Sequence, residues 1–315
     1  LKNQVSINNK RNTILIPSYT FSSTAAAFLK FGFKVKFIDI SPYNLMLDQS
    51  SLSNVSLKNV LAIVNVNYGS YVNNINEIKN ICLKNKIYLI EDAAQAYGSL
   101  FKNKNIGTFG DFGCFSFHET KNIQSGLGGA LIVKNAKLFK IASMIRDRGT
   151  DRESLSANKK KFYEWTCLGG SYIPTELEAS YLYPQLINCK KVIQKRKKLF
   201  DLYYNSLNEN RDLIYFPYLQ DQFTSNYHSF WISFKTQILR DRFIKFMFSN
   251  NISCYIGYIP LHSSAYGKKN NFNSKLKNTD KLASTIVRLP LYTNMTIHNV
   301  NLVIKKTKLF IKLIK

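Results

Sequence analysis

The chain has 315 residues, 45% of them hydrophobic, and a formal net charge of +25 at pH 7. This is enough chain to bury the cores of one large domain and one smaller domain, and it contains no apolar run long enough to span a bilayer. Residues 1–12 are polar and basic and lack the apolar stretch of a signal peptide. We therefore expect a cytoplasmic protein.

The cysteines and the charge argue against a metal site and against a nucleic-acid or membrane partner. The five cysteines have no zinc-site spacing, so we expect reduced thiols and no metal; they are Cys82, Cys114, Cys167, Cys189 and Cys254. The positive charge could indicate a nucleic-acid or membrane partner, but lysines are spread along the whole chain. The densest run, residues 190–198, falls on a predicted helix, and no nucleic-acid-binding motif is present. Neither partner is therefore expected.

Predicted strands alternate with predicted helices through the first half of the chain. Residues 60–66 form an almost continuous apolar run, which is typical of a strand buried on both faces. The same patterns predict strands at 13–16, 34–40, 87–90, 112–117 and 130–133, and helices at 22–31 and 75–85. This alternation predicts an α/β fold with a mostly parallel sheet and helices on both of its faces.

The second half has a different pattern. Helical periodicity begins near Pro174 and continues, with breaks, to about Leu207. A strand at 228–234, a helix at 241–249 and a closing helix over 300–314 are also predicted. We therefore expect a large domain over residues 1–183 and a smaller C-terminal α+β domain over residues 184–315.

Three polar clusters lie at the ends of predicted strands, at the edge of a parallel sheet where ligands bind. They are EDAAQA at 91–96, SFHETKN at 116–122 and the turn GLGG at 126–129. Pyridoxal phosphate needs a lysine for its Schiff base, an acid that keeps its pyridine nitrogen protonated, and donors for its phosphate. Lys121, Asp92 and Ser116 supply one of each.

Longer blocks carry a family resemblance. In chain order they are IPSYTFSSTAAAF, IEDAAQAYGS, GDFGCFSFHETKN, GLGGAL, IRDRGTDR, SYIPTELEASYL, YIPLHSSAYG and RLPLY. With these blocks the chain resembles the DegT/DnrJ/StrS nucleotide-sugar aminotransferases over most of its length. The resemblance implies a pyridoxal-phosphate-dependent transferase of fold type I, the aspartate-aminotransferase-like fold. It also implies amino transfer from L-glutamate to a 4-keto-6-deoxy nucleotide sugar such as dTDP-4-keto-6-deoxy-D-glucose.

The resemblance implies catalytic roles for three residues. Lys121 would form the Schiff base with pyridoxal 5'-phosphate and then move the proton between the amino donor and the cofactor. Asp92 would pair with the pyridine nitrogen. His118 would lie near the cofactor.

Further residues are implied to bind rather than to react. Gln95 would hydrogen-bond the hydroxyl of the cofactor ring, Phe21 would stack on that ring, and Ser116 would bind the phosphate. Ser171 occupies a place from which relatives reach the cofactor of a neighbouring subunit, which implies a homodimer with shared active sites. For His262, a purely structural role is as good an interpretation as a functional one.

Two alternatives stay open. The first is a pyridoxal-phosphate-dependent sugar dehydratase on the same fold, in which a histidine typically replaces the Schiff-base lysine; Lys121 weighs against it. The second is an inactive truncated product. Relatives carry several tens of residues before the position of Ile16, including a turn that helps to bind the cofactor phosphate. Residues 1–12 contain no such turn, so we expect the N-terminal part of the large domain to be missing.

Overall fold

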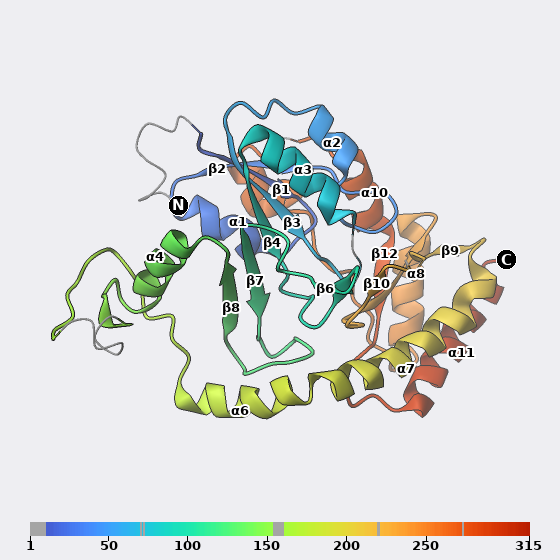
Figure 1. Ribbon diagram of the computed structural model, residues 1–315. Coiled ribbons are helices and arrows are strands. Elements are labelled where there is room, and N and C mark those ends of the chain that lie inside the picture. The colour runs from blue at the N-terminus through green and yellow to red at the C-terminus, as the bar shows by residue number, and fades with distance from the viewer. Residues whose placement is uncertain (1–10, 70, 72, 154–160, 219–220, 273) are drawn as a thin grey trace.

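One mixed sheet organises the first half of the chain (Figure 1). The computed structural model describes residues 11–69, 71, 73–153, 161–218, 221–272 and 274–315. Its six-stranded sheet has the order β2-β1-β3-β4-β7-β8. Adjacent strands are parallel except for β8, which runs antiparallel to β7. The strands are β1 (Thr13–Pro17), β2 (Lys34–Ile38), β3 (Val60–Val66), β4 (Tyr88–Asp92), β7 (Phe112–Ser116) and β8 (Gly129–Val133).

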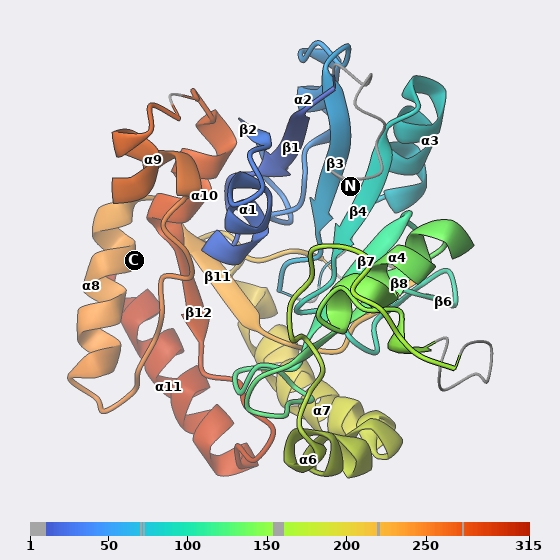
Figure 2. The same ribbon diagram turned by 90° about the vertical axis from the view of Figure 1, so that its left-hand side faces the viewer.

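The two faces of this sheet pack against different parts of the chain (Figure 2). Successive strand residues point to opposite faces, so Leu15 and Ile63 pack in one core with α3 (Ile75–Asn85). Ile14 and Val64 pack in a second core with α1 (Ser22–Leu29) and with residues of the C-terminal half. The mostly parallel sheet is as predicted. The prediction of helices on both faces is only partly confirmed, because much of the second face is covered by the C-terminal half.

The C-terminal half builds its own small antiparallel sheet, with the order β12-β11-β9. Helices pack around it and bury aromatic side chains such as Phe230, Phe243 and Phe310 in the shared core. The elements are β9 (Ile214–Tyr215), β11 (Phe230–Phe234), α8 (Gln237–Phe248), α9 (Ala265–Lys269), α10 (Lys277–Thr285), β12 (Ile286–Leu289) and α11 (Ile297–Leu313), with 3-10 turns η1 (Asn208–Asn210) and η2 (Leu261–Ser263).

The long helical stretch between the two halves is two helices, α6 (Glu176–Ile187) and α7 (Cys189–Leu207). A capping box starts α6: the Glu178 N–H donates to Thr175 Oγ1 at 3.2 Å, and the Glu178 carboxylate accepts from the Thr175 N–H at 2.8 Å. The helix α7 buries Phe200 and Tyr203, whereas α6 has no buried residue. Residue 183 lies within α6, and the division into two domains there stays a prediction.

The remaining elements are short and mostly peripheral. They are α2 (Gln49–Ser53), β5 (Leu100–Phe101), β6 (Lys104–Asn105), α4 (Ala136–Arg146) and β10 (Phe223–Thr224). The helix predicted over 22–31 ends at Leu29, because Gly32 (φ 75°) takes the left-handed conformation that turns the chain into β2. Within the described part of the chain, no helix is both long enough and apolar enough to cross a membrane.

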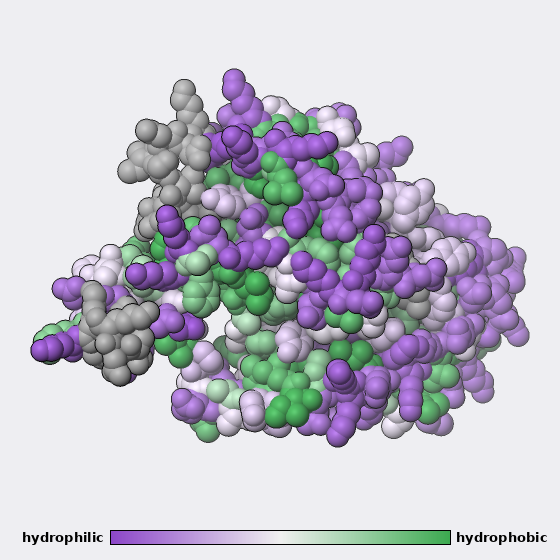
Figure 3. Space-filling view, viewed as in Figure 1, coloured by the Kyte–Doolittle hydropathy of each residue, from purple (hydrophilic) through white to green (hydrophobic). Residues whose placement is uncertain are grey.

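Some apolar side chains stay exposed, and they gather on β8, on α6 and on the segment before α6. Figure 3 shows hydrophobic surface over α6, in contrast to the hydrophilic surface over the opposite end of the molecule. The exposed side chains include Leu131, Trp165, Leu168, Tyr172, Leu177, Tyr181 and Ile187. Exposed apolar side chains that gather in this way are typical of surfaces that bind another molecule.

Candidate active site

A cavity of about 1380 Å³ lies at the carboxyl ends of β3, β4 and β7, between the large sheet and the C-terminal half. Parallel strands bring their ends to one edge of the sheet, so side chains that are distant in sequence meet there. Six of the seven predicted site residues line this cavity: Phe21, Asp92, Gln95, Ser116, His118 and Lys121. Ser171 does not line it; this residue is exposed and forms an isolated antiparallel bridge with Asp147.

Asp92, the last residue of β4, is held by side chains that the sequence patterns did not single out. The Thr24 hydroxyl, on α1, donates to Asp92 Oδ2 at 2.6 Å, and the Ala94 N–H donates to Oδ1 at 3.2 Å. Thr20 Oγ1 lies 2.9 Å from Thr24 Oγ1 and completes a short hydroxyl chain. The carboxylate is therefore oriented before any ligand binds.

Lys121 lies in the turn after β7, with its N–H donating to the carbonyl of His118 at 2.8 Å. Burial lowers the pKa of its amine; the nearby Asp92 carboxylate opposes this effect, and the Arg288 guanidinium adds to it. A lysine whose charged form is disfavoured by burial offers more of the neutral amine, which is the form that attacks a carbonyl.

Gln95 has a fixed amide orientation. Its Oε1 accepts from the Gly69 N–H at 2.8 Å, so its Nε2 faces the Tyr258 hydroxyl and donates to it at 3.2 Å. Burial raises the pKa of Tyr258 to about 12. The ring of Phe21, 57% exposed, lies 5.7 Å from the Tyr258 ring between centroids. A flat apolar ring and a fixed amide therefore share one wall of the cavity.

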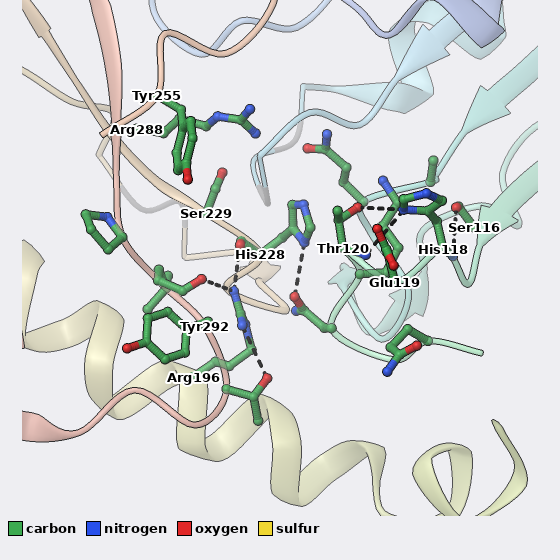
Figure 4. A pocket seen from close by; sticks show the side chains of 18 of the residues that line it. Ser116, His118, Glu119, Thr120, Arg196, His228, Ser229, Tyr255, Arg288 and Tyr292 are labelled. Carbon is green, nitrogen blue, oxygen red and sulfur yellow. Dashed lines mark hydrogen bonds between the residues drawn. The ribbon is translucent and has the colours of Figure 1, made fainter. Parts of the chain in front are cut away.

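Ser116 and His118 lie together on one side of the cavity, next to Thr120 (Figure 4). The Ser116 hydroxyl accepts from the His118 N–H at 3.3 Å, and His118 Nδ1 lies 3.1 Å from Thr120 Oγ1. Figure 4 shows Arg288, Tyr255 and His228 across the cavity from this group. These side chains come from segments more than a hundred residues away, and the sequence patterns assigned none of them a role in catalysis or binding.

Arg196, which is buried, and Arg288, which is half-buried, both line the cavity, but their surroundings differ. The Arg196 guanidinium donates hydrogen bonds to the carbonyls of Tyr227, His228 and Leu291, at 2.6 to 3.1 Å. Burial lowers its pKa to about 10. Among the described residues no carboxylate pairs with Arg288. Burial lowers the pKa of Arg288, but electrostatic interactions with three neighbouring tyrosines together outweigh burial and raise it. Arg288 is therefore a cation at the cavity wall that can still bind an anion.

His262 lies apart from the cavity lining. Its ring is buried and bridges Ser18, directly after β1, and Asp280 on α10. Within the described part of the chain, no group of three His, Cys, Asp or Glu side chains could hold a metal ion.

The donor set fits pyridoxal phosphate. A lysine amine of lowered pKa, a preoriented carboxylate, a fixed amide, a hydroxyl and an exposed aromatic ring all face one cavity. These are the groups needed for the Schiff base, the pyridine nitrogen, the ring hydroxyl, the phosphate and the ring face. The assignment of each group to one residue stays a prediction.

Known proteins resemble the chain over nearly its whole length. The sequence profile of the DegT/DnrJ/EryC1/StrS aminotransferase family matches residues 1–308. The chain is 28% identical to the GDP-4-keto-6-deoxy-D-mannose 3-dehydratase of Escherichia coli O55:H7, covering 92% of this chain and 72% of that protein. It is 27% identical to the UDP-4-amino-4,6-dideoxy-N-acetyl-beta-L-altrosamine transaminase of Campylobacter jejuni, covering 93% and 78%.

The solved structures show the same fold. Helicobacter pylori PseC, an aminotransferase involved in the biosynthesis of pseudoaminic acid, superposes with a TM-score of 0.86 at 22% identity. The match covers 96% of this chain and 80% of that one. The predicted fold type I is thereby confirmed.

Proposed function

Because the chain belongs to the DegT/DnrJ/EryC1/StrS aminotransferase family, we propose that it moves an amino group onto a 4-keto-6-deoxy nucleotide sugar. Pyridoxal 5'-phosphate is the cofactor, and Lys121 is the lysine that carries it. One observation carries the proposal: the half-buried Lys121, whose amine has a lowered pKa, and the nearby Asp92 carboxylate line the same cavity.

Each side chain of the cavity has a different role in the proposed reaction. When bound, the cofactor supplies an electron sink for the carbon that gains or loses the amino group. Lys121 Nζ, whose pKa is lowered by burial, would move the proton from the donor carbon to the cofactor in the first half of the cycle, and from the cofactor to the sugar carbon in the second. Asp92, held by Thr24, keeps a negative charge at the pyridine nitrogen. Gln95 holds the ring hydroxyl, and the reaction alternates between the two substrates.

The remaining lining residues bind and orient the cofactor. Phe21 covers the ring face and keeps water away from it. The Ser116 hydroxyl donates to the phosphate, and His118, bonded to the hydroxyl of Thr120, lies beside it.

Arg288 supports an amino acid as the donor, and we propose L-glutamate. Its guanidinium perturbs the pKa of Lys121, so an anion bound to Arg288 lies close to the reacting amine. The α-carboxylate of an amino acid is one bond from the reacting carbon. The diphosphate of a 4-keto sugar nucleotide is attached on the far side of the sugar ring. The carboxylate therefore fits this cation better.

For the acceptor we propose dTDP-4-keto-6-deoxy-D-glucose, with dTDP-4-amino-4,6-dideoxygalactose as the product. The support is the form of three motifs, SFHETKN at 116–122, YIPLH at 258–262 and RLPLY at 288–292, which resemble those of dTDP-4-amino-4,6-dideoxygalactose transaminase. Such an amino sugar would serve a cell-surface polysaccharide of the enterobacterial-common-antigen or lipopolysaccharide kind. The five free cysteines support a cytoplasmic location.

A sugar dehydratase is the second candidate, because the Escherichia coli dehydratase is as similar to the chain as the Campylobacter transaminase is. Lys121 separates the two activities. A dehydratase is favoured by a residue, such as histidine, that cannot form a Schiff base with the cofactor. A lysine can form one and therefore competes with any other amine for the cofactor. We therefore favour amino transfer.

A homodimer with shared active sites is also proposed. The apolar side chains exposed around β8 and α6 (Figure 3) provide a surface for a second copy. Ser171 lies in the segment that precedes α6 and is exposed rather than directed into its own cavity. In a dimer formed through this surface, Ser171 could reach the neighbouring cofactor.

The experiment has two stages. Purified protein is loaded with pyridoxal phosphate, reduced with borohydride and mapped by peptide mass; the label is expected on Lys121. Lys134→Arg is the matched control, because burial also lowers the pKa of Lys134, which lies outside the cavity. L-Glutamate and the dTDP sugar are then supplied in turn. A product in which an amino group replaces the oxo group supports the proposal; a product that has lost water favours the dehydratase, and a label elsewhere contradicts both.

A further inference from the structure

One segment, the strap (residues 255–262), crosses from the small sheet to the large domain and is pinned at both ends. At its start, Tyr255 pairs with Arg288 of β12 through two backbone hydrogen bonds, of 3.2 and 2.7 Å. At its end, the Leu261 N–H donates to the Ser18 carbonyl at 2.9 Å, and the His262 N–H donates to Ser18 Oγ at 3.0 Å. The strap therefore connects one wall of the cavity to the end of β1.

The middle of the strap places Tyr258 in the cavity. Gly257 has φ 81°, and a Cβ there would lie 2.3 Å from the Tyr19 hydroxyl oxygen, so only glycine lets the strap approach this closely. The Tyr258 ring then packs 5.6 Å from Tyr68 and 5.7 Å from Phe21, between centroids. Its hydroxyl accepts the hydrogen bond from Gln95 Nε2.

A hydrogen-bonded chain, Ser18–His262–Asp280, holds the far end. Ser18 is fully buried, and its Oγ lies 2.7 Å from His262 Nδ1. The Asp280 carboxylate can only accept, so Nε2, which lies 3.1 Å from Asp280 Oδ1, carries a ring hydrogen. With that hydrogen on Nε2, Nδ1 accepts from the Ser18 hydroxyl. Each polar atom of the ring has one partner.

We propose that His262 is a positioning residue: bonded to Ser18, it fixes the strap on the large domain so that Tyr258 holds the Gln95 amide toward the bound cofactor. This rests on the proposed function, in which Gln95 bonds the ring hydroxyl. The effect of His262 therefore passes through Tyr258 and Gln95 to a group that touches the cofactor.

A purely structural histidine would only hold the two domains together. A contact between α10 and the large domain that does not involve the strap serves as the comparison. Asp39 accepts hydrogen bonds from the N–H groups of Asn278 and Thr279, at 3.0 and 2.8 Å, and from the Thr279 hydroxyl at 2.6 Å. This contact joins the same helix α10 to the large domain without involving the strap. Thr279→Val is therefore a matched control for loss of stability alone.

The test compares cofactor affinity, the visible absorbance of the lysine–cofactor adduct, and the melting temperature. His262→Gln keeps a donor near the position of Nε2 but loses the acceptor for Ser18, and Ser18→Ala removes the same bond from the other side. Both should bind pyridoxal phosphate about three- to tenfold more weakly, as expected for one lost hydrogen bond, with a shifted absorbance maximum. His262→Asn keeps an acceptor near the position of Nδ1 and should restore most of the affinity. Thr279→Val should lower the melting temperature but leave the affinity and absorbance unchanged.

A double-mutant cycle with Tyr258→Phe, which removes only the hydroxyl, tests whether His262 affects cofactor affinity through Tyr258. If His262 acts through Tyr258, His262→Gln has no further effect on affinity in the Tyr258→Phe background. Additive losses, normal affinity in the His262→Gln and Ser18→Ala variants, or an equal loss in Thr279→Val would each overturn the inference. If His262→Gln does not fold, Ser18→Ala carries the comparison. Failure of the proposed function is visible beforehand, as an unsubstituted protein that forms no adduct at Lys121.

Discussion

At the scale of single residues, Asp92 is the side chain whose charge matters most. Asp92→Asn keeps the size of the side chain and its bond to the Thr24 hydroxyl, but removes the negative charge at the pyridine nitrogen. Preorganised electrostatic interactions in a closed site contribute several kcal/mol. We expect kcat to fall by at least about a hundredfold while the fold is kept, as measured by steady-state kinetics and circular dichroism. Near-normal kcat would contradict the assigned role.

A substitution at Thr24 should have a smaller effect on kcat than Asp92→Asn. Thr24→Val removes the hydroxyl that orients Asp92 but leaves the charge in place. Loss of one hydrogen bond to a charged group costs about 1.5–3 kcal/mol. The variant should therefore lie between the native protein and Asp92→Asn in kcat. A variant as slow as Asp92→Asn would mean that Thr24 does more than orient the carboxylate.

His228 makes the stability depend on pH. Burial, followed by the charges of Arg196, Lys121 and Arg288, holds the pKa of His228 well below 6.5. The unfolded chain, with a histidine pKa of about 6.5, thus binds this proton at higher pH than the folded chain does. The stabilisation is complete above pH 6.5 and is lost as the pH falls below it, at up to about 1.4 kcal/mol per pH unit. Urea unfolding across this range should show the loss, and His228→Gln should remove that part of the slope.

At the scale of elements, Glu91 anchors the loop that leads into β7. Its fully buried carboxylate accepts from the N–H groups of Gly107, Phe109 and Gly110, at 2.9, 2.5 and 2.8 Å. Glu91→Gln would turn an amide N–H toward these donors. We expect a loss of about 2–4 kcal/mol in the free energy of unfolding, since buried donors are left without an acceptor. Glu77→Gln, at an exposed position on α3, is the control and should change it by less than about 0.5 kcal/mol.

At the scale of the whole molecule, the exposed surface around α6 predicts dimerisation. Leu177 on α6 is 82% exposed, and Leu177→Glu would bury a charge in the dimer interface. The dimer should dissociate at least tenfold more readily, as measured by analytical ultracentrifugation, with a parallel loss of activity. Ile238→Glu on α8 is the control, because Ile238 is also exposed, at 72%, but lies away from this surface. A monomeric native protein with full activity would remove the basis for shared active sites.

The sequence predicted best what depends on local pattern. The buried run of β3 and the positions of Asp92 and Lys121 at strand ends follow from periodicity and from the rule that ligands bind at those ends. Thr24, Tyr258 and Arg288 were not assigned roles, because tertiary packing alone brings their segments to the cavity. No short motif encodes a threonine that orients an acid 68 residues away.

The division of the large sheet between two cores has a consequence for how the chain is made. Ile14 and Val64 share a core with Val303 and Phe310, so one face of the central sheet is not fully covered until the last helix leaves the ribosome. At 5–20 residues per second, the roughly 240 residues between Val64 and Val303 take about 12–48 s to synthesise. During that time the nascent chain presents an apolar sheet face to its surroundings, which makes it a client for chaperones. Substitutions in α11 should therefore lower the yield of folded protein during synthesis more than they alter the site of the mature enzyme.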